Sequence, residues 1–324
     1  MTGAAGLLGS HLVDHLLRRD FFVTGIDNLS IGKKENLNEA FSSQKFKFSE
    51  FDVLDEKLFD RFDQHDIIVH MAAYKIEVPG LKGVDILNVN ANGTHRMLEL
   101  ARRWNARFIF ASTSDVYGKS VNFPFHEEGD LIVGAPRIER WRYAVSKMFD
   151  EHMCYAYSKE FKLPITIIRY FNTYGPRHDI SILSGGPQAL FFDAILRGHE
   201  ITIHGDGSQR RCFAYVDDSI EMTCRVIESK LTINQVLNIG NPYNEISILN
   251  LAKLAHKISG GEKTPPIKFI THEQFYKTEK FEEVNRRIPD ISKAERLLKY
   301  SPKITNEEGL KRTFEWQRKQ DCYQ

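Results

Sequence analysis

The chain has 324 residues, of which 42% are hydrophobic, so it can bury a large core and exceeds one typical domain. Its 44 lysines and arginines nearly balance its 43 aspartates and glutamates, which gives no electrostatic footprint for nucleic acid or an anionic membrane. No apolar run approaches the roughly 20 residues of a membrane span, and the four cysteines form no C-x-x-C pair. We therefore expect a cytoplasmic protein without a metal site or a disulfide framework.

The first nine residues, MTGAAGLLG, place Gly3, Gly6 and Gly9 directly before a helical pattern. A glycine turn that leads into a helix binds anions, because backbone N–H groups and the helix dipole point at the ligand. An apolar run follows and ends in Asp27. This combination is the dinucleotide-binding fingerprint, so we expect a diphosphate at this turn.

Only Met1 and Thr2 precede the turn, although this fingerprint normally follows a buried strand. A missing central strand would leave groups of both neighbouring strands unpaired, at about 1–3 kcal/mol for each dry group. We therefore expect about five to ten further residues upstream in the natural protein, one strand's length. If the chain is complete as given, we expect a weakened cofactor site.

Apolar, β-branched runs alternate with helical patterns through the first half, as in a parallel sheet covered on both faces. The order predicts a doubly wound α/β sheet of Rossmann type, with its first strand missing, and a smaller C-terminal α/β domain. The predicted strands are residues 21–27, 46–52, 66–73, 107–112 and 164–170, and the predicted helices are 10–19, 55–61, 87–104 and 144–160. The domains are expected over residues 1–172, to which about 212–240 return, and over 173–324.

Asp27 is expected to accept hydrogen bonds from the adenosine ribose hydroxyls. Its charge would repel a 2′-phosphate, which favours NAD over NADP as the cofactor. Lys33 and Lys34 follow closely and would soften that preference.

Two further strand ends are expected near the cofactor. Asp52 ends the second predicted strand, although an aspartate there is more often a cap or a turn residue. The small residues Ala72 and Ala73 follow His70 and would let the backbone approach the cofactor. A lone histidine such as His70 at the end of a strand is more often a buried core residue than a catalytic one.

The reacting centre is predicted from Tyr143 and Lys147, which a helix places on one face. A tyrosine with a pKa of about 10 is a poor base at neutral pH, but a nearby ammonium and a nicotinamide cation would lower that pKa. Such pairs also occur by chance on solvated helices. The segment STSDVYG supports a catalytic role for this pair, because the Thr113 hydroxyl could share a substrate proton with Tyr143.

The whole chain resembles the NAD-dependent sugar-nucleotide epimerase/dehydratase family of extended short-chain dehydrogenases/reductases. The resemblance rests on motifs in the family's order, from Thr2 to about Leu310. They are TGAAGLLGSHL, GIDNLS, HMAA, Asn90 with Gly93-Thr94, STSDVYG, YAVSK, RYFNTYGPR, IHGDGSQRRCFAYVDD, NIGNP and RRIPDISKAERLL. The chain is similar to UDP-sugar 4-epimerases and UDP-glucuronate decarboxylases in particular. The resemblance makes residues 1–172 the NAD-binding domain and 173–324 the sugar-nucleotide-binding domain.

The resemblance implies a role for each matching residue. Tyr143 would take the proton of the sugar 4-hydroxyl while hydride moves from carbon 4 to NAD, with Lys147 and Thr113 assisting. The catalytic set would be Tyr143, Lys147, Thr113 and Asp115. The cofactor would contact Gly3, Gly6, Leu7, Leu8, Asp27, Asn28, Asp52, Val53, Ala72, Ala73, Asn90, Ser112, Tyr143 and Lys147. The substrate would contact Ser114, Asn172, Arg211 and Arg287, since arginine forks suit a diphosphate.

Two segments are expected at the sugar nucleotide. Residues 201–205 would lie beside the nucleobase, and the loop SILSGGPQ, residues 181–188, would shape the sugar pocket. The nucleotide is expected to be UDP.

The reaction after oxidation at carbon 4 depends on few side chains. A 4-epimerase only returns hydride to the other face, and it ranks slightly first. A UDP-glucuronate decarboxylase ranks next, since the family's decarboxylases carry Ser-Glu where this chain has Ser114-Asp115. The stretch DLIVG, residues 130–134, followed by RWRY, residues 140–143, also looks like bacterial glucuronate decarboxylases. The shorter carboxylate would sit about 1.5 Å inward, and misplacement on this scale can cost about 10²-fold in rate. A 4,6-dehydratase ranks third because its acid is missing.

Two broader expectations complete the interpretation. A protein of this fold could instead be an NAD-binding sensor or scaffold, but Tyr143, Thr113 and Lys147 are all present. A homodimer is expected, because helices 87–104 and 144–160 carry apolar stripes and pair across a two-fold axis in the family. The stripes include Met97, Leu98, Met148, Phe149 and Met153, although packing on the sheet would also explain them.

Overall fold

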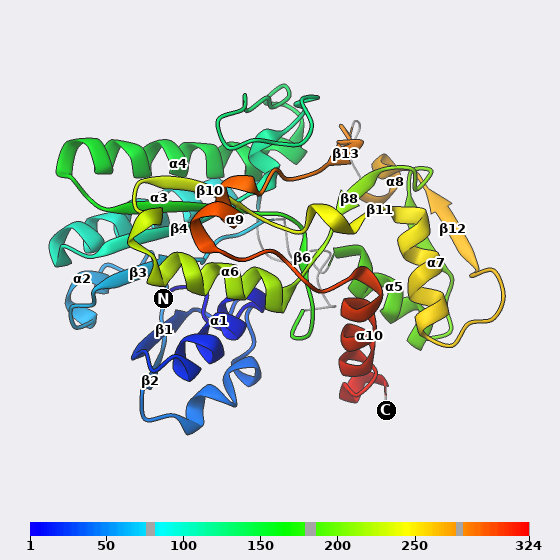
Figure 1. Cartoon of the computed structure of the whole chain (residues 1–324), viewed down its shortest axis with the longest axis horizontal. Coiled ribbons are helices and arrows are strands. Elements are labelled where there is room, and N and C mark those ends of the chain that lie inside the picture. Colours follow the sequence, from blue (N-terminus) through cyan, green and yellow to red (C-terminus); the bar gives the residue numbers. More distant parts are fainter. Residues whose placement is uncertain (76–81, 179–185, 277–280, 324) are drawn as a thin grey trace.

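A parallel sheet forms the centre of the larger part of the molecule in the computed structural model, which describes residues 1–75, 82–178, 186–276 and 281–323 (Figure 1). β1 pairs with β2, and β3, β4, β5 and β10 pair in the order β3-β4-β5-β10, each pair in parallel. The strands are β1 (Val23–Asp27), β2 (Phe46–Glu50), β3 (Ile67–His70), β4 (Arg107–Thr113), β5 (Ile165–Tyr170) and β10 (Gln235–Ile239). The predicted doubly wound α/β fold is confirmed, and the five predicted strands form with small shifts at their ends.

Thr2 occupies the place of the first strand. It forms parallel bridges to Ile26 of β1 and to His70 of β3, and so connects the two halves of the sheet. The Thr2 amide donates to the Val69 carbonyl, and the Ile26 amide donates to the Met1 carbonyl. The expectation that both neighbouring strands would be left unpaired is therefore only partly right, since Met1 and Thr2 take up part of the hydrogen bonding.

Helices cover both faces of this sheet (Figure 1). α3 (Gly83–Trp104) and α4 (Arg142–Phe161) pack together on one face, and α1 (Leu7–Arg18) and α6 (Val216–Glu228) pack together on the other. The predicted helix 55–61 is shorter, as α2 (Leu58–Arg61).

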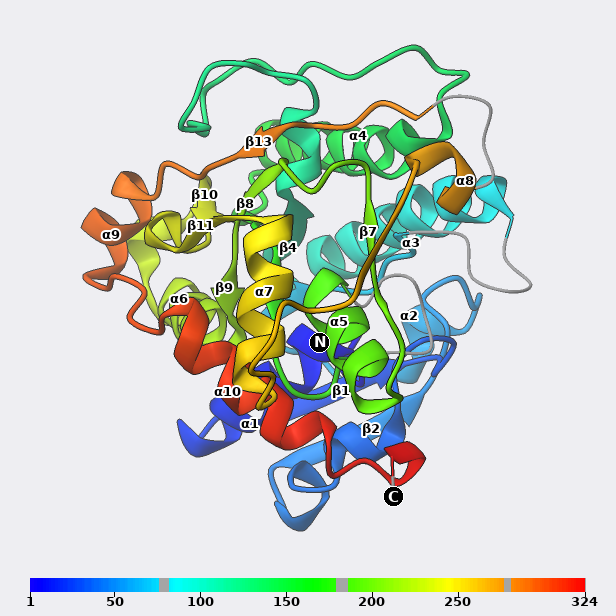
Figure 2. The same cartoon turned by 90° about the vertical axis from the view of Figure 1, so that its right-hand side faces the viewer.

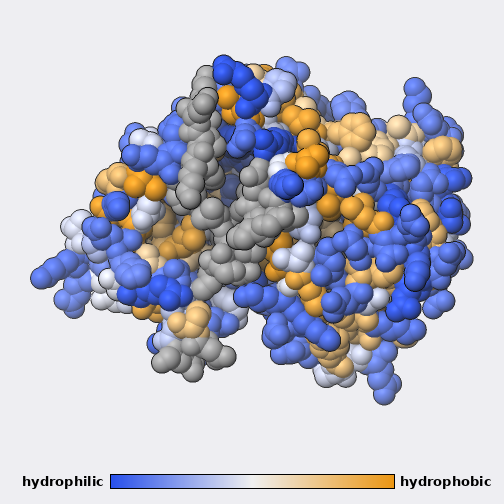
Figure 3. Space-filling view, turned by 180° about the vertical axis from the view of Figure 1, so that it is seen from behind, coloured by the Kyte–Doolittle hydropathy of each residue, from blue (hydrophilic) through white to orange (hydrophobic). Residues whose placement is uncertain are grey.

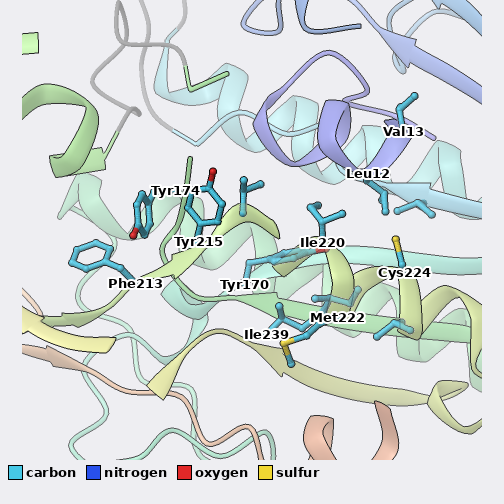
Figure 4. Packing of buried hydrophobic residues seen from close by; sticks show 14 of the residues in the cluster. Leu12, Val13, Tyr170, Tyr174, Phe213, Tyr215, Ile220, Met222, Cys224 and Ile239 are labelled. Carbon is cyan, nitrogen blue, oxygen red and sulfur yellow. The ribbon is translucent and has the colours of Figure 1, made fainter. Parts of the chain in front are cut away.

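Apolar side chains from several elements fill the core beneath α1 and α6 (Figure 4). Leu12 and Val13 of α1 lie near Ile220 and Cys224 of α6, and all four are buried. The cluster continues to Tyr174, Phe213 and Tyr215, toward the second part of the molecule. The helix α1 that follows the glycine turn therefore packs on a well-filled core.

The second part of the molecule is built from small sheets and helices (Figure 2). β8 (Arg210–Cys212) lies between β11 (Glu245–Ser247) and β13 (Arg286–Arg287), and β7 (Ile201–His204) pairs with β12 (Ile267–Ile270). Short strands β6 (Thr173–Tyr174) and β9 (Ala214–Tyr215) connect this part to the main sheet. The helices are α5 (Gly186–Leu196), α7 (Ile248–Ile258), α8 (His272–Tyr276), α9 (Ser292–Leu298) and α10 (Asn306–Gln317).

Hydrophilic and hydrophobic residues alternate over the face of the molecule that Figure 3 shows from behind. Within the described residues, no helix combines the length and the hydropathy that crossing a bilayer requires.

Candidate active site

The glycine turn has the backbone geometry that a dinucleotide diphosphate needs. Gly3 has a φ of +69°, which favours glycine, and a Cβ on Gly9 would lie 1.9 Å from the Gly3 carbonyl oxygen. Gly6 precedes α1, and the first turn of this helix holds no acidic residue. The free N–H groups and positive dipole of α1 can therefore face an anion, and the residues present fit a dinucleotide.

Asp27 closes this turn from the end of β1. Its carboxylate accepts hydrogen bonds from the Ala5 amide and the Leu29 amide, both at 2.9 Å. Burial raises the pKa of Asp27, while these two hydrogen bonds lower it. The carboxylate thus lies beside the glycine turn, where the sequence predicts the adenosine ribose.

Asn28 and Asp52 meet at the ends of β1 and β2. The Asn28 amide donates to Asp52 Oδ2 at 2.8 Å, and Asp52 Oδ1 accepts from the Leu54 amide at 2.8 Å. Asp52 therefore has the turn-capping role that the sequence favours for it, in a position next to Asn28.

Several other predicted cofactor residues are engaged within the chain. Asn90 is buried and bonds to both backbone groups of Tyr74 and to Ser146, and Ser112 donates to Glu151. Val53 is buried against Gly93. Leu7, Leu8, Ala72 and Ala73 are half-buried near the turn and the end of β3.

His70 is a core residue, as expected. Its ring is buried, its Nδ1 lies 2.7 Å from the Thr2 hydroxyl, and burial holds its pKa well below the usual range.

The predicted reacting centre assembles where β4 ends against the start of α4. Thr113 is the last residue of β4, and Tyr143 and Lys147 lie in the first two turns of α4. Lys147 is 1% exposed, and its Nζ donates to the Ala111 carbonyl at 2.9 Å and lies 4.4 Å from the centre of the Phe110 ring.

The expected effect of Lys147 on Tyr143 is not seen. Burial raises the pKa of Tyr143 above its usual range, the Asp115 charge adds to this, and a hydrogen bond with Thr113 opposes it. Lys147 exerts no resolved effect, because its ammonium is directed at Ala111 and Phe110. The lowering of this pKa by the ammonium therefore stays a prediction, and a bound nicotinamide cation would act in the same direction as the hydrogen bond with Thr113.

Asp115 lies in the middle of a cluster of cations. Its Oδ1 is 2.6 Å from Arg287 and 3.7 Å from Arg140, and its Oδ2 accepts a hydrogen bond from the Thr113 hydroxyl at 3.3 Å. Burial raises the pKa of Asp115, but Arg287, Arg140 and Lys75 outweigh burial and hold it well below the usual range. Asp115 is thus a charged carboxylate beside Thr113.

Arg211 pairs with a second carboxylate in the same region. Its Nη2 lies 2.7 Å from Glu283, which also lies 2.8 Å from His272. Burial lowers the pKa of Arg211 to about 10, and Arg287 contributes to this shift. The arginines on the adjacent strands β8 and β13 thus lie in one positively charged region.

The remaining predicted substrate residues surround this region. Asn172 donates to the Cys212 carbonyl at 3.2 Å, and Ser114 is buried next to Asp115. Residues 201–205 form β7 and the turn after it, where Gly205 approaches His272. Residues 181–185 of the predicted sugar-pocket loop lie outside the described residues.

Sequence reasoning missed Arg140, Lys75 and Glu283. For Arg140 a signal existed, since it stands three residues before Tyr143, in the short turn Glu139–Trp141 directly before α4. Lys75 and Glu283 have no local pattern that sets them apart from surface charges.

Residues 1–313 match the family model described as GDP-mannose 4,6 dehydratase. The UDP-N-acetyl-alpha-D-glucosaminuronate decarboxylase of Bacillus cytotoxicus is 35% identical, over 98% of this chain and 96% of that protein. The UDP-glucuronate 4-epimerase of Thermodesulfobacterium geofontis is 33% identical, over 98% of this chain and 94% of that protein.

Solved structures agree. UDP-glucose 4-epimerase of Thermotoga maritima, with UDP-glucose, has a TM-score of 0.85 and 33% identity, and the match covers 98% of this chain and 97% of that one. UDP-glucuronic acid 4-epimerase of Bacillus cereus, in complex with UDP-glucuronic acid and NAD, has a TM-score of 0.84 and 32% identity, over 98% of each chain.

The fold and the site define a member of the NAD-dependent nucleotide-sugar epimerases, decarboxylases and dehydratases, which confirms the resemblance. Within this class, the chain belongs to the GDP-mannose 4,6 dehydratase family.

Proposed function

We propose that this enzyme is a UDP-hexuronate decarboxylase that first oxidises carbon 4 of the sugar with NAD. The observation that carries the proposal is Asp115, a charged carboxylate that accepts a hydrogen bond from Thr113 and acts electrostatically on Tyr143. A substituent on the sugar carbon next to carbon 4 would lie close to it.

The surrounding cations suit a substrate with more charge than a diphosphate alone. Arg211 and Arg287 lie on β8 and β13, where we expect the diphosphate. Arg140 lies 3.7 Å from the same Asp115 oxygen that Arg287 contacts, directly before α4 in the chain. An arginine fork there is suited to a sugar carboxylate. The names of two decarboxylase relatives and of one 4-epimerase relative each contain a UDP-linked hexuronate.

In the first step, the oxidation of sugar carbon 4, several residues of the chain have separate roles. The glycine turn and Asp27 would hold NAD, which supplies the hydride acceptor when bound. Thr113 orients the 4-hydroxyl, and Tyr143 accepts its proton. Because burial raises the pKa of Tyr143, the cofactor's positive charge is needed to make this tyrosine an effective base.

The 4-keto hexuronate is a β-keto acid and loses carbon dioxide readily. Arg140 would orient this carboxylate, while a negative charge close to it would raise its energy relative to the product and so favour decarboxylation. Asp115 is such a charge, because Arg287, Arg140 and Lys75 keep it ionised. Loss of carbon dioxide breaks the bond between carbons 5 and 6, leaves its electron pair on the 4-keto group as an enolate, and relieves the repulsion between the two carboxylates. Protonation at carbon 5 and return of the hydride to carbon 4 would then give the UDP-pentose.

A 4-epimerase on the same UDP-hexuronate is the second candidate, and the sequence expectation ranked 4-epimerisation first. The solved relatives described above are 4-epimerases, and Asp115 is held by Arg287 and Thr113. The ranking is reversed here because the 35% identical relative is named a decarboxylase and covers almost all of both chains.

Product analysis separates the two reactions. With NAD and UDP-glucuronate labelled at carbon 6, we expect labelled carbon dioxide and a UDP-pentose, measured by trapping and mass spectrometry. A UDP-hexuronate epimer without gas release would contradict the proposal in favour of 4-epimerisation. In Asp115→Asn, carbon dioxide release per oxidation should fall about 10²-fold, as is typical when one electrostatic group is lost. Asp206→Asn, an exposed change near β7, is the control.

We also propose that the chain forms a homodimer through α3 and α4. Met97 and Leu98 are core residues of the chain itself, so they do not support an interface. Val84, Leu87, Val145 and Phe149 support it, because all four are exposed apolar residues of these helices.

Light scattering at micromolar concentration should therefore give the mass of a dimer. Phe149→Glu should give a monomer, because it places a charge in the apolar contact. Phe22→Glu changes an exposed phenylalanine outside these helices and should leave the dimer intact. A monomeric unmodified chain would contradict the dimer.

A further inference from the structure

A buried carboxylate with no role in the steps above lies on the catalytic helix. Asp150 has an exposed fraction of 0%, and neither of its carboxylate oxygens has a hydrogen-bond partner within the described residues. The Thr94 hydroxyl on α3 faces it without a hydrogen bond of ordinary geometry. An isolated buried carboxylate is strongly unfavourable, so Asp150 needs a compensating charge.

Lys147 is the candidate for that charge, although no ion pair within 4.0 Å joins its ammonium to Asp150 among the described residues. It lies three residues before Asp150 on the same face of α4, and it is itself 1% exposed. Its hydrogen bond to Ala111 goes to a neutral carbonyl, which cannot offset the ammonium. Burial lowers the pKa of Lys147, and Asp150 is the strongest of the charges that oppose this shift.

The neighbouring carboxylate of Glu151 is already neutralised. Arg169 of β5 holds it through two hydrogen bonds, at 2.7 Å and 3.0 Å, and Ser112 donates to it as well. It therefore has less charge to offer to Lys147.

The other titratable groups around Lys147 are either uncharged or already paired, so they do not balance its ammonium. Burial raises the pKa of the Cys154 thiol and lowers that of His70 on β3, so both stay uncharged near neutral pH. Asp115, from the turn after β4, acts on Tyr143 but is held by arginines.

We propose that Asp150 is a positioning residue of the catalytic pair, which supplies the counter-charge that keeps the buried Lys147 protonated. The proposal rests on the proposed function only in taking Tyr143 and Lys147 as the reacting pair. Asp150 acts through Lys147 by balancing the charge of this buried ammonium, whose Nζ lies at the Ala111 carbonyl, and its own negative charge also raises the pKa of Tyr143. The carboxylate and the ammonium together leave no net charge behind the tyrosine.

The pH dependence of kcat tests this role. In Asp150→Asn, Lys147 should release its proton at lower pH, so the alkaline limb of the profile should move down by about one unit or more. Asp150→Glu, which keeps the charge, should restore most of the shift. Glu160→Gln, on an exposed position of the same helix, is the control. A uniform loss of kcat at all pH values, with the limb unmoved, would overturn the proposal.

Unfolding of the substrate-free protein gives a second measurement. Burial raises the pKa of Asp150 to about 7, so the folded state binds more protons than the unfolded state between about pH 4 and 7. This carboxylate therefore lowers the stability as the pH rises through that window. The melting temperature of the unmodified chain, relative to Asp150→Asn, should fall between pH 5 and pH 8. A constant difference would overturn the proposal.

The two measurements also separate this proposal from the proposed function. If no UDP-hexuronate were turned over, the unfolding measurement would still test the charge of Asp150. If turnover occurred with an unmoved alkaline limb and a constant melting difference, only the role of Asp150 would fall.

Discussion

Replacement of Tyr143 with phenylalanine is expected to reduce kcat by about 10²–10⁴-fold, the usual contribution of a general base. The change removes only the hydroxyl that would accept the proton of the sugar 4-hydroxyl. Tyr143 is half-buried at the start of α4, so the ring should keep its packing. Steady-state product formation from UDP-glucuronate, with the melting temperature measured in parallel, checks the result.

Tyr155→Phe is the matched control, since Tyr155 lies on the same helix with 45% of its surface exposed. It should retain the unmodified rate. A Tyr143→Phe enzyme that kept full activity would contradict the mechanism, because no other tyrosine of α4 is bonded to Thr113 within the described residues.

Replacement of Arg287 with lysine should lower kcat/KM for the sugar nucleotide by about 10–100-fold, the range expected for loss of one charged hydrogen bond. Lysine keeps the charge but loses the planar fork that can bind a diphosphate and Asp115 together. Arg287 is 5% exposed and lies 2.6 Å from Asp115, so the shorter reach of lysine cannot be absorbed by solvent. Initial rates over a range of substrate concentrations give the value.

Arg286→Lys provides a control one residue away. Arg286 is exposed and pairs with Glu245 on the surface, where an ion pair contributes about 0–1 kcal/mol. Its replacement should leave kcat/KM unchanged. Equal losses in the two variants would contradict a specific role for the guanidinium of Arg287 beside Asp115.

The sequence predicted the features that depend on local pattern. Gly3 and Gly9 were identified by their spacing, and the structure shows why only glycine fits at both. Tyr143 and Lys147 were identified because four residues make one helical turn. Strand positions followed from continuous apolar runs, which a sheet covered on both faces requires.

Long-range charge contacts could not be predicted in the same way. Arg287 is far from Asp115 in the sequence, and only the fold brings β13 to the turn after β4. The pKa of Tyr143 was expected to fall because helical spacing suggested a nearby ammonium. Spacing does not fix where a long side chain points, and Lys147 points to Ala111. Asp150 is buried, although nothing in the local sequence distinguishes it from an exposed helix residue.

The place of Thr2 in the sheet links cofactor affinity to folding. Of the described residues, Thr2 forms the bridges that connect β1 to β3, and the glycine turn begins at the very next residue. A dinucleotide seated on that turn would rest on the same few residues that join the two halves of the sheet. Its binding would act as a structural staple, adding about 2.7 kcal/mol of stability at a ligand concentration of 100 times Kd. Changes at Thr2 that weaken the sheet would then appear in a binding experiment as lost affinity for the cofactor.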